Sequence, residues 1–291
     1  MGGARLFATA LLVALGLVLA GCGGGGEAAR DRAYHLAQQA GFTRTVIAAG
    51  PFHLMAFLRL SAPSPVLRVY IEGDGHAWQT TDLPSSDPTP WSPVALELAA
   101  VDPAPAVATL ARPCQYVAPG TDAACTQSAW TNARYSPAVI ASTNLALDRL
   151  KALAGAAQLE LVGFSGGGAV AVLAGARRSD LRDLRTVAAN LDTALWTREH
   201  GVSPLIGSLN PADVAPRLAN LPQLHFVGGA DQVVNLAVVR AFAAATGATH
   251  CAGIQVVPDM GHDGDWPTLW PELLSQPLPT GCNGRTSGAI R

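Results

Sequence analysis

A serine in a glycine-rich turn is the residue of this sequence best placed to do chemistry. Ser165 is the central residue of the segment 163–167, Gly-Phe-Ser-Gly-Gly, which matches the pattern Gly-x-Ser-x-Gly. The apolar segment 159–164 predicts a strand, and the segment 166–178 predicts a helix. So tight a turn needs small neighbours, and a helix start supplies free N–H groups that favour negative charge. The pattern therefore favours a nucleophilic serine, the alternative being a serine with only a structural role in the turn.

An aspartate and a histidine follow later predicted strands. Asp231 comes after the strand at 224–227, and His262 comes after the last strand at 254–257. The carboxyl ends of parallel strands meet at one edge of a sheet, where the sites of open α/β sheets form. A serine hydroxyl needs a base and an orienter of that base, and these two side chains can supply both. Asp192, after the preceding predicted strand, is the competing acid.

The turn around Ser165 and the chain order serine, acid, histidine resemble the α/β-hydrolase family. The resemblance covers roughly residues 45–280. It implies that Ser165 attacks an ester or related acyl bond of a small molecule, with His262 as general base and Asp231 orienting it. Neither a metal nor an organic cofactor is implied, and acyl transfer or peptide cleavage would use the same groups. The alternative is a non-catalytic envelope lipoprotein that uses this fold as a binding module.

The same resemblance implies an oxyanion hole made of backbone N–H groups. One donor is Gly166, and the other belongs to the loop 72–75 after an early strand, with Asp74 preferred over Gly75. Because a carboxylate would destabilise an oxyanion, we expect the Asp74 side chain to point away or to pair, for example with an arginine. His76, in the same loop, is a candidate substrate contact, and a plain surface position is its alternative.

Short apolar segments alternate with helical segments along most of the chain. Predicted strands cover 45–48, 52–60, 66–71, 107–111, 159–164, 184–189, 224–227 and 254–257, and predicted helices cover 27–40, 94–100, 137–154, 166–178 and 236–245. The first two strands suit an antiparallel hairpin at the N-terminal edge. The alternation that follows predicts an α/β fold, a mostly parallel sheet with helices on both faces. A long loop at 112–136 and a short cap-like insertion at 193–222 interrupt it, and their aromatic residues are expected at a pocket mouth or packed on the core.

The N-terminal segment is predicted to be an export signal. Arg5 is followed by an uncharged apolar run that is shorter than the about 20 residues of a membrane span. This run ends in Leu-Ala-Gly-Cys, which resembles the bacterial lipoprotein signal and implies cleavage before Cys22 and its lipidation. An uncleaved anchor is the alternative. We therefore expect a signal peptide at 1–21, a flexible tether at 22–30 and a hydrolase domain at 31–291.

This resemblance implies a protein of the bacterial cell envelope that is bound to a membrane through its lipid anchor. In Gram-negative lipoproteins an aspartate directly after the lipidated cysteine favours the inner membrane. This position is Gly23 here, so the resemblance favours the periplasmic side of the outer membrane if the source is Gram-negative. Lysines and arginines number 19 against 21 acidic residues, so nucleic acid is not an expected partner. The sequence carries no signal of an oligomeric state.

Four cysteines remain after the lipidated one. An even number outside the cytoplasm predicts two disulfides. Of the three possible pairings we favour Cys114–Cys125 and Cys251–Cys282, because each pair is near in sequence and flanks irregular chain. Metal binding is disfavoured, since no histidine stands at zinc spacing from these residues.

Overall fold

The computed structural model describes residues 24–247 and 250–282. The expected signal peptide at 1–21 and the lipidation residue Cys22 lie outside the described residues. In the part of the chain that is described, no helix has the length and apolar character needed to cross a membrane.

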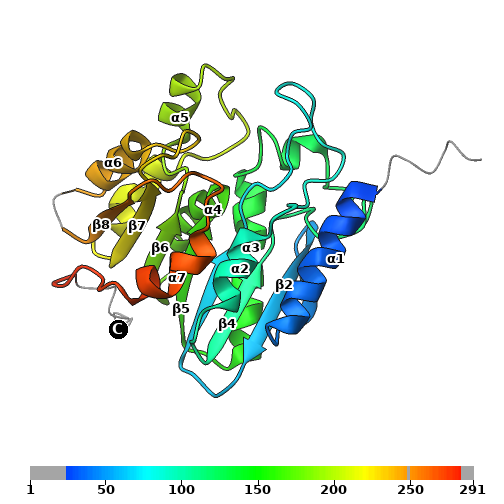
Figure 1. The fold of residues 1–291 in the computed structure, drawn as a ribbon, viewed down its shortest axis with the longest axis horizontal. Helices are drawn as coiled ribbons and strands as arrows, with labels where there is room; N and C mark the ends of the chain where they lie inside the picture. The colour runs from blue at the N-terminus through cyan, green and yellow to red at the C-terminus, as the bar shows by residue number, and fades with distance from the viewer. Residues whose placement is uncertain (1–23, 248–249, 283–291) are drawn as a thin grey trace, which may run out of the picture.

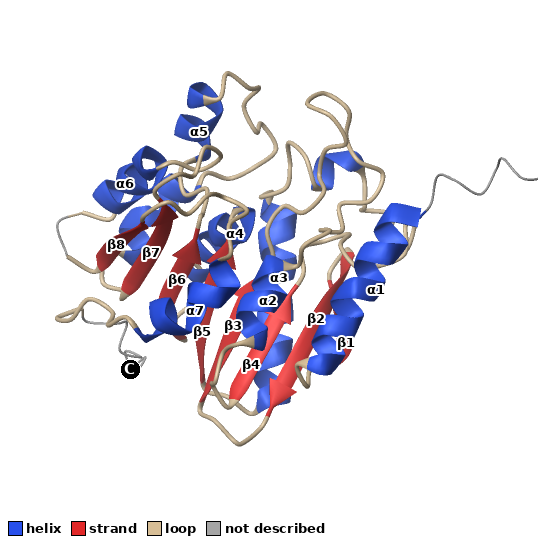
Figure 2. Ribbon diagram, viewed as in Figure 1, coloured by secondary structure: helices blue, strands red, loops and turns tan. Residues whose placement is uncertain are grey.

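A single eight-stranded sheet forms the centre of the molecule (Figures 1 and 2). Its strands are β1 (Thr43–Ala49), β2 (Phe52–Leu60), β3 (Val66–Ile71), β4 (Ala106–Leu110), β5 (Gln158–Phe164), β6 (Leu181–Val187), β7 (Gln223–Gly228) and β8 (Ala252–Val257). They lie in the order β1-β2-β4-β3-β5-β6-β7-β8. Strand β2 is antiparallel to both neighbours, and all other pairs are parallel. The mostly parallel sheet and its N-terminal hairpin are therefore confirmed.

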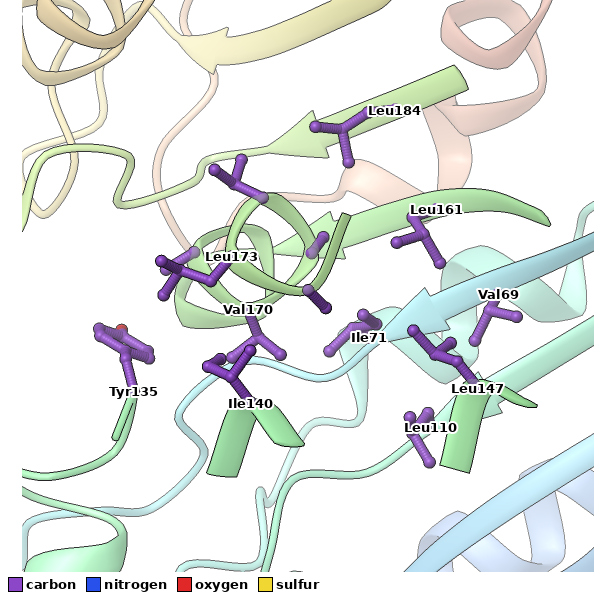
Figure 3. Close-up of a cluster of buried hydrophobic side chains, with 14 of the residues drawn as sticks. Val69, Ile71, Leu110, Tyr135, Ile140, Leu147, Leu161, Val170, Leu173 and Leu184 are labelled. Atoms are coloured by element: carbon purple, nitrogen blue, oxygen red, sulfur yellow. The ribbon is translucent and has the colours of Figure 1, made fainter. Parts of the chain in front are cut away.

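Helices cover both faces of the sheet. They are α1 (Gly24–Gln39), α2 (Val94–Ala100), α3 (Pro137–Ala154), α4 (Gly166–Gly175), α5 (Thr193–Glu199), α6 (Leu236–Ala245) and α7 (Trp266–Ser275), with short 3-10 helices η1 (Gln127–Ala129) and η2 (Pro211–Leu218). One apolar core lies between the sheet and α3, α4 and α6, and a second lies under α1, α2 and α7. Figure 3 shows the first core, where Ile140 and Val170 point toward Ile71 on β3. Both faces are thus closed to water, which leaves the loops at the carboxyl edge free to form a site.

Two elements differ from the sequence-based expectation. The tether expected at 22–30 is wrong for residues 24–30, which form the first part of α1. Here Ala29 is buried and Arg30 pairs with Asp87 at 2.6 Å, so packing against the domain outweighs the low helix propensity of glycine. Helix α7 was not predicted because Pro267 and Pro271 interrupt its pattern. Pro267 lies in the first turn, where a helix tolerates proline, whereas Pro271 lies inside the helix and removes one backbone N–H donor.

Both favoured disulfides are present in the structure. Cys114 is bonded to Cys125 within the loop 112–136, and Cys251, directly before β8, is bonded to Cys282. The first closes a loop that reaches the candidate site, and the second fixes the chain after α7 to the sheet edge. The loop is also tied to β2, because the His53 N–H donates to the Asp122 carboxylate.

Candidate active site

Ser165 occupies a strained turn between β5 and α4. Its φ of 51° and ψ of −122° lie in a region that residues with a side chain rarely adopt. The turn closes so tightly that a Cβ atom on Gly163 would lie 2.4 Å from the Gly168 Cα, and one on Gly167 would lie 2.1 Å from the Ile71 carbonyl oxygen. The glycines at 163 and 167 are therefore steric requirements. The turn lifts the serine hydroxyl clear of the sheet.

The structure brings Ser165, His262 and Asp231 together at the carboxyl edge of the sheet. The His262 Nε2 lies 3.0 Å from the Ser165 Oγ, and the His262 Nδ1 lies 2.9 Å from the Asp231 Oδ2. The other oxygen of Asp231 accepts the N–H groups of Val233 and Val234 at 2.7 and 2.8 Å. The Asp231 side chain is completely buried, so no water competes for its hydrogen bonds. These contacts fix the carboxylate, and the carboxylate fixes the imidazole ring.

The competing acid has a different role in the fold. Asp192 is the N-cap residue of α5, where its carboxylate accepts the Leu195 N–H at 3.0 Å. It also accepts the Asn210 side-chain amide at 3.2 Å. Asp192 is therefore engaged in starting a helix, and the histidine bonds to Asp231.

Asp74 is held in a buried cluster of charges beside the serine turn. Its carboxylate lies 3.0 Å from the Arg112 Nη1 and accepts the Tyr135 hydroxyl at 2.9 Å. The Arg134 Nε also lies within 3.0 Å, in a geometry too bent for a hydrogen bond. Burial raises the pKa of Asp74, but the opposing charges of Arg134 and Arg112 outweigh burial and lower it. Asp74 is thus paired, as we expected, and with two arginines.

The two backbone donors expected to form an oxyanion hole lie on facing loops. A Cβ atom on Gly166 would lie 2.0 Å from the Asp74 Oδ1, so the loop after β3 contacts the first residue of α4. Within residues 24–247 and 250–282, neither the Gly166 nor the Asp74 N–H donates to a protein acceptor. Gln115 fixes the loop by donating to the Gly73 carbonyl at 3.0 Å. Both N–H groups are therefore available to a ligand.

A cavity of about 340 Å³ opens over Ser165 and His262. Its walls are the loop 72–76 and the segment 90–94, which includes Trp91. Sequence analysis identified His76 as a candidate contact and missed Trp91, for which the only signal was a tryptophan within a proline-rich loop. The aromatic residues of the loop 112–136, Tyr116, Trp130 and Tyr135, are instead buried in the cores.

Glu72 is a buried carboxyl group in the floor of this cavity that sequence analysis also missed. It follows β3 directly and accepts the N–H groups of Ala95 and Leu96 at 3.3 and 3.2 Å. Burial raises the pKa of Glu72 to about 7, although the hydrogen bonds from Leu96 and Ala95 oppose the rise. The group therefore joins the loop that carries Asp74 to the start of α2.

The stability of the protein should depend on pH through Glu72. Its folded-state pKa of about 7 exceeds the ordinary 4.5, so the folded state binds more protons between these values and stability falls as pH rises. At about 1.36 kcal/mol per pKa unit, this loss amounts to roughly 3 kcal/mol. Urea unfolding of wild type and Glu72→Gln from pH 4 to 8 measures it: the wild type should lose that amount relative to the variant. Glu272→Gln, which changes an exposed glutamate, is the control. If the unfolding free energies of wild type and Glu72→Gln differ by the same amount at every pH, Glu72 does not cause the pH dependence.

Solved structures of other proteins resemble this chain in fold, although no sequence comparison gives a match. No family model and no curated protein sequence matches the chain. Among many similar solved structures is XC6422 from Xanthomonas campestris, described as an α/β serine hydrolase without lid, at 16% identity and a TM-score of 0.51 over 79% of this chain and 92% of that one. Est1E from Butyrivibrio proteoclasticus is 14% identical to this chain, with a TM-score of 0.54 over 79% of this chain and 95% of that one.

A third similar structure is a longer protein. A puromycin-hydrolyzing peptidase of Mycobacterium tuberculosis matches 80% of this chain at 14% identity and a TM-score of 0.57, over 38% of its own length. Together with the strand order and the serine turn, these matches define the class: the chain has the α/β-hydrolase fold.

Proposed function

We propose that the protein is a serine hydrolase that cleaves an ester or a related acyl bond of a small molecule. One observation carries the proposal: the hydrogen-bonded chain from Ser165 through His262 to the buried Asp231, at the floor of an open cavity. Serine hydrolases and peptidases among the proteins of similar fold support it.

The proposed reaction proceeds through an acyl-enzyme. The Ser165 Oγ attacks the acyl carbon while His262 Nε2 accepts its proton, and Asp231 stabilises the imidazolium that forms. The N–H groups of Gly166 and Asp74 donate to the tetrahedral oxyanion. His262 then gives the proton to the leaving group, whose bond to the acyl carbon breaks. A water molecule, deprotonated by His262, attacks the acyl-serine ester, and the serine recovers its proton as the acid departs.

The charges around Asp74 favour this intermediate. A lone carboxylate next to an oxyanion would raise its energy. Here two guanidinium groups, of Arg112 and Arg134, accompany one carboxylate, so the cluster carries a net positive charge. The cluster therefore favours negative charge on the substrate oxygen while it holds the Asp74 backbone in place.

We further propose that the enzyme is a lipid-anchored protein of the bacterial cell envelope. The lipoprotein-like signal that ends at Cys22 supports this, as do two disulfides, which persist in oxidising compartments. Because α1 begins at Gly24, the anchored residue would stand next to the folded domain in sequence. Mass spectrometry of the protein from a membrane fraction checks this, and an unmodified Cys22 thiol would refute it.

Labelling with a fluorophosphonate probe tests the proposed hydrolase activity. The purified domain should form a covalent adduct at Ser165, because the probe reacts with serines that a base activates. Ser165→Ala should lose labelling completely, and Ser61→Ala, which changes an exposed serine in the turn between β2 and β3, should retain it. A folded wild-type protein that is not labelled would contradict the proposal.

A further inference from the structure

Two aromatic side chains in the lining of the cavity over Ser165 stack on each other. The rings of His76 and Trp91 are stacked, with centroids 4.4 Å apart and planes inclined by 22°. Both residues line the cavity, and 55% of the Trp91 surface is exposed. We call this pair the aromatic shelf. A large apolar side chain left open beside a nucleophile offers apolar area to a ligand.

The aromatic shelf is held rigidly by its two loops. The His76 N–H donates to the Pro88 carbonyl at 3.1 Å, and Arg32 donates to the Trp91 carbonyl at 3.1 Å. Gly75, at φ 68°, lies so close to this segment that a Cβ atom there would be 2.2 Å from the Pro88 oxygen. These contacts fix the backbone of both loops next to each other, and a fixed backbone lowers the entropic cost of binding a ligand on the shelf.

The described lining of the cavity offers an anionic ligand no ion-pair partner from a lysine or an arginine. Among the described residues that line the cavity, none is a lysine or an arginine, whereas Glu72, Asp74 and Asp263 carry carboxyl groups. The nearby guanidinium groups of Arg112 and Arg134 already pair with Asp74. The two guanidinium groups are thus engaged with Asp74, so a substrate carboxylate or phosphate would find no lysine or arginine in the described lining with which to pair.

We propose that the substrate carries an uncharged aromatic ring, in its acid or its alcohol part, that stacks on Trp91 of the aromatic shelf. The inference rests on the proposed serine hydrolase function and names its substrate class. Aromatic rings prefer offset-stacked or edge-to-face contacts, and such pairs contribute more than their buried area alone. Trp91 is thereby a specificity-determining residue, which touches the substrate and takes no part in the bond exchange.

Two pairs of esters with equal carbon skeletons test the proposal. Ethyl 3-phenylpropanoate and ethyl 3-cyclohexylpropanoate differ only in the ring of the acid part. The acetates of 2-phenylethanol and 2-cyclohexylethanol differ only in the ring of the alcohol part. We expect kcat/KM to be about tenfold higher for the aromatic member of at least one pair, a ratio typical of one good stacking contact. The pair that responds identifies the part of the substrate that the shelf binds.

Two tryptophan variants make the test specific. Trp91→Leu keeps an apolar side chain and should lower the aromatic preference to about one. Trp78→Leu is the matched control, because Trp78 is 41% exposed but does not line the cavity, and it should keep the preference. Ethyl 3-(4-carboxyphenyl)propanoate, an anionic ester, should react at least about tenfold more slowly than its neutral parent.

The outcomes separate failure of this inference from failure of the proposed function. An enzyme that reacts with fluorophosphonate but shows no aromatic preference in either pair would overturn the inference alone. A preference that survives in Trp91→Leu, or fastest turnover of the anionic ester, would also overturn it. If the folded wild type neither reacts with the probe nor hydrolyses any ester, the proposed function fails, and the inference fails with it.

Discussion

Asp231→Asn is expected to lower kcat for an ester by about 10³ to 10⁴-fold. The Asp231 carboxylate accepts a hydrogen bond from the His262 Nδ1–H, with 2.9 Å between the heavy atoms. Its side chain is completely buried, so neither water nor another acid can replace it. An asparagine can present its NH₂ group to the ring and favour the wrong tautomer, and it cannot stabilise the imidazolium by charge. Steady-state kinetics on a short aliphatic ester measures the effect, with circular dichroism to establish folding.

Asp192→Asn is the matched control for this experiment. Asp192 follows β6, the strand beside β7, and its carboxylate caps α5. Asparagine is as good a cap residue as aspartate, so the free energy of unfolding should change by less than about 1 kcal/mol and kcat by less than about threefold. Near-wild-type kcat in Asp231→Asn together with a large loss in Asp192→Asn would reverse the assignment of the acid.

The positions that Ser165, Asp231 and His262 take in the structure could be predicted from the sequence because they depend on local pattern. A strand, a tight turn and a helix are all encoded within the segment 159–178, so the environment of Ser165 needs no distant information. Asp231 and His262 follow predicted strands, and parallel strands deliver their carboxyl ends to one edge. The topology then brings the three side chains together.

The surroundings of the serine could not be predicted in the same way. Arg112 and Arg134 reach Asp74 from a loop without periodicity, and nothing in the sequence pairs them with it. Glu72 is unusual only because α2 covers it, and Trp91 reaches the cavity only because the segment 90–94 folds back over the loop after β3. Such contacts arise from tertiary packing between loops, for which a single sequence carries no periodic signal.

Helix α7 is a case in which tertiary packing outweighs local propensity. Its two prolines hide the helical pattern, while Trp266 and Trp270 are completely buried against the sheet. The Trp270 indole donates to the Tyr70 hydroxyl at 2.9 Å, which satisfies the one polar atom of its ring. Burial of two large rings therefore stabilises a segment whose sequence alone does not predict a helix. This matters for the site, because α7 follows directly from the loop that carries His262.

Asp74→Asn is expected to lower kcat by about 10- to 100-fold, less than the complete loss of an oxyanion-hole donor. The backbone N–H remains, but the loop loses the charge that holds it between Arg112 and Arg134. The N–H would then no longer point at the oxyanion in most molecules. Since the contact strengthens only in the transition state, kcat should fall while KM changes little.

The same substitution should destabilise the fold, and a second variant separates the two effects. Asp74→Asn leaves two largely buried guanidinium groups without their counter-charge, at a cost of roughly 3 kcal/mol in the free energy of unfolding. Asp180→Asn is the matched control: Asp180 pairs with Lys151 and Arg178 at the opposite, N-terminal end of β6. It should lose stability but keep kcat within about threefold.

The comparison of the two variants decides what the Asp74 cluster does. If both lose stability and only Asp74→Asn loses kcat, the cluster positions the oxyanion donor as well as stabilising the loop. Equal kcat values for Asp74→Asn and wild type, measured below the unfolding transition of each, would leave the cluster a purely structural role.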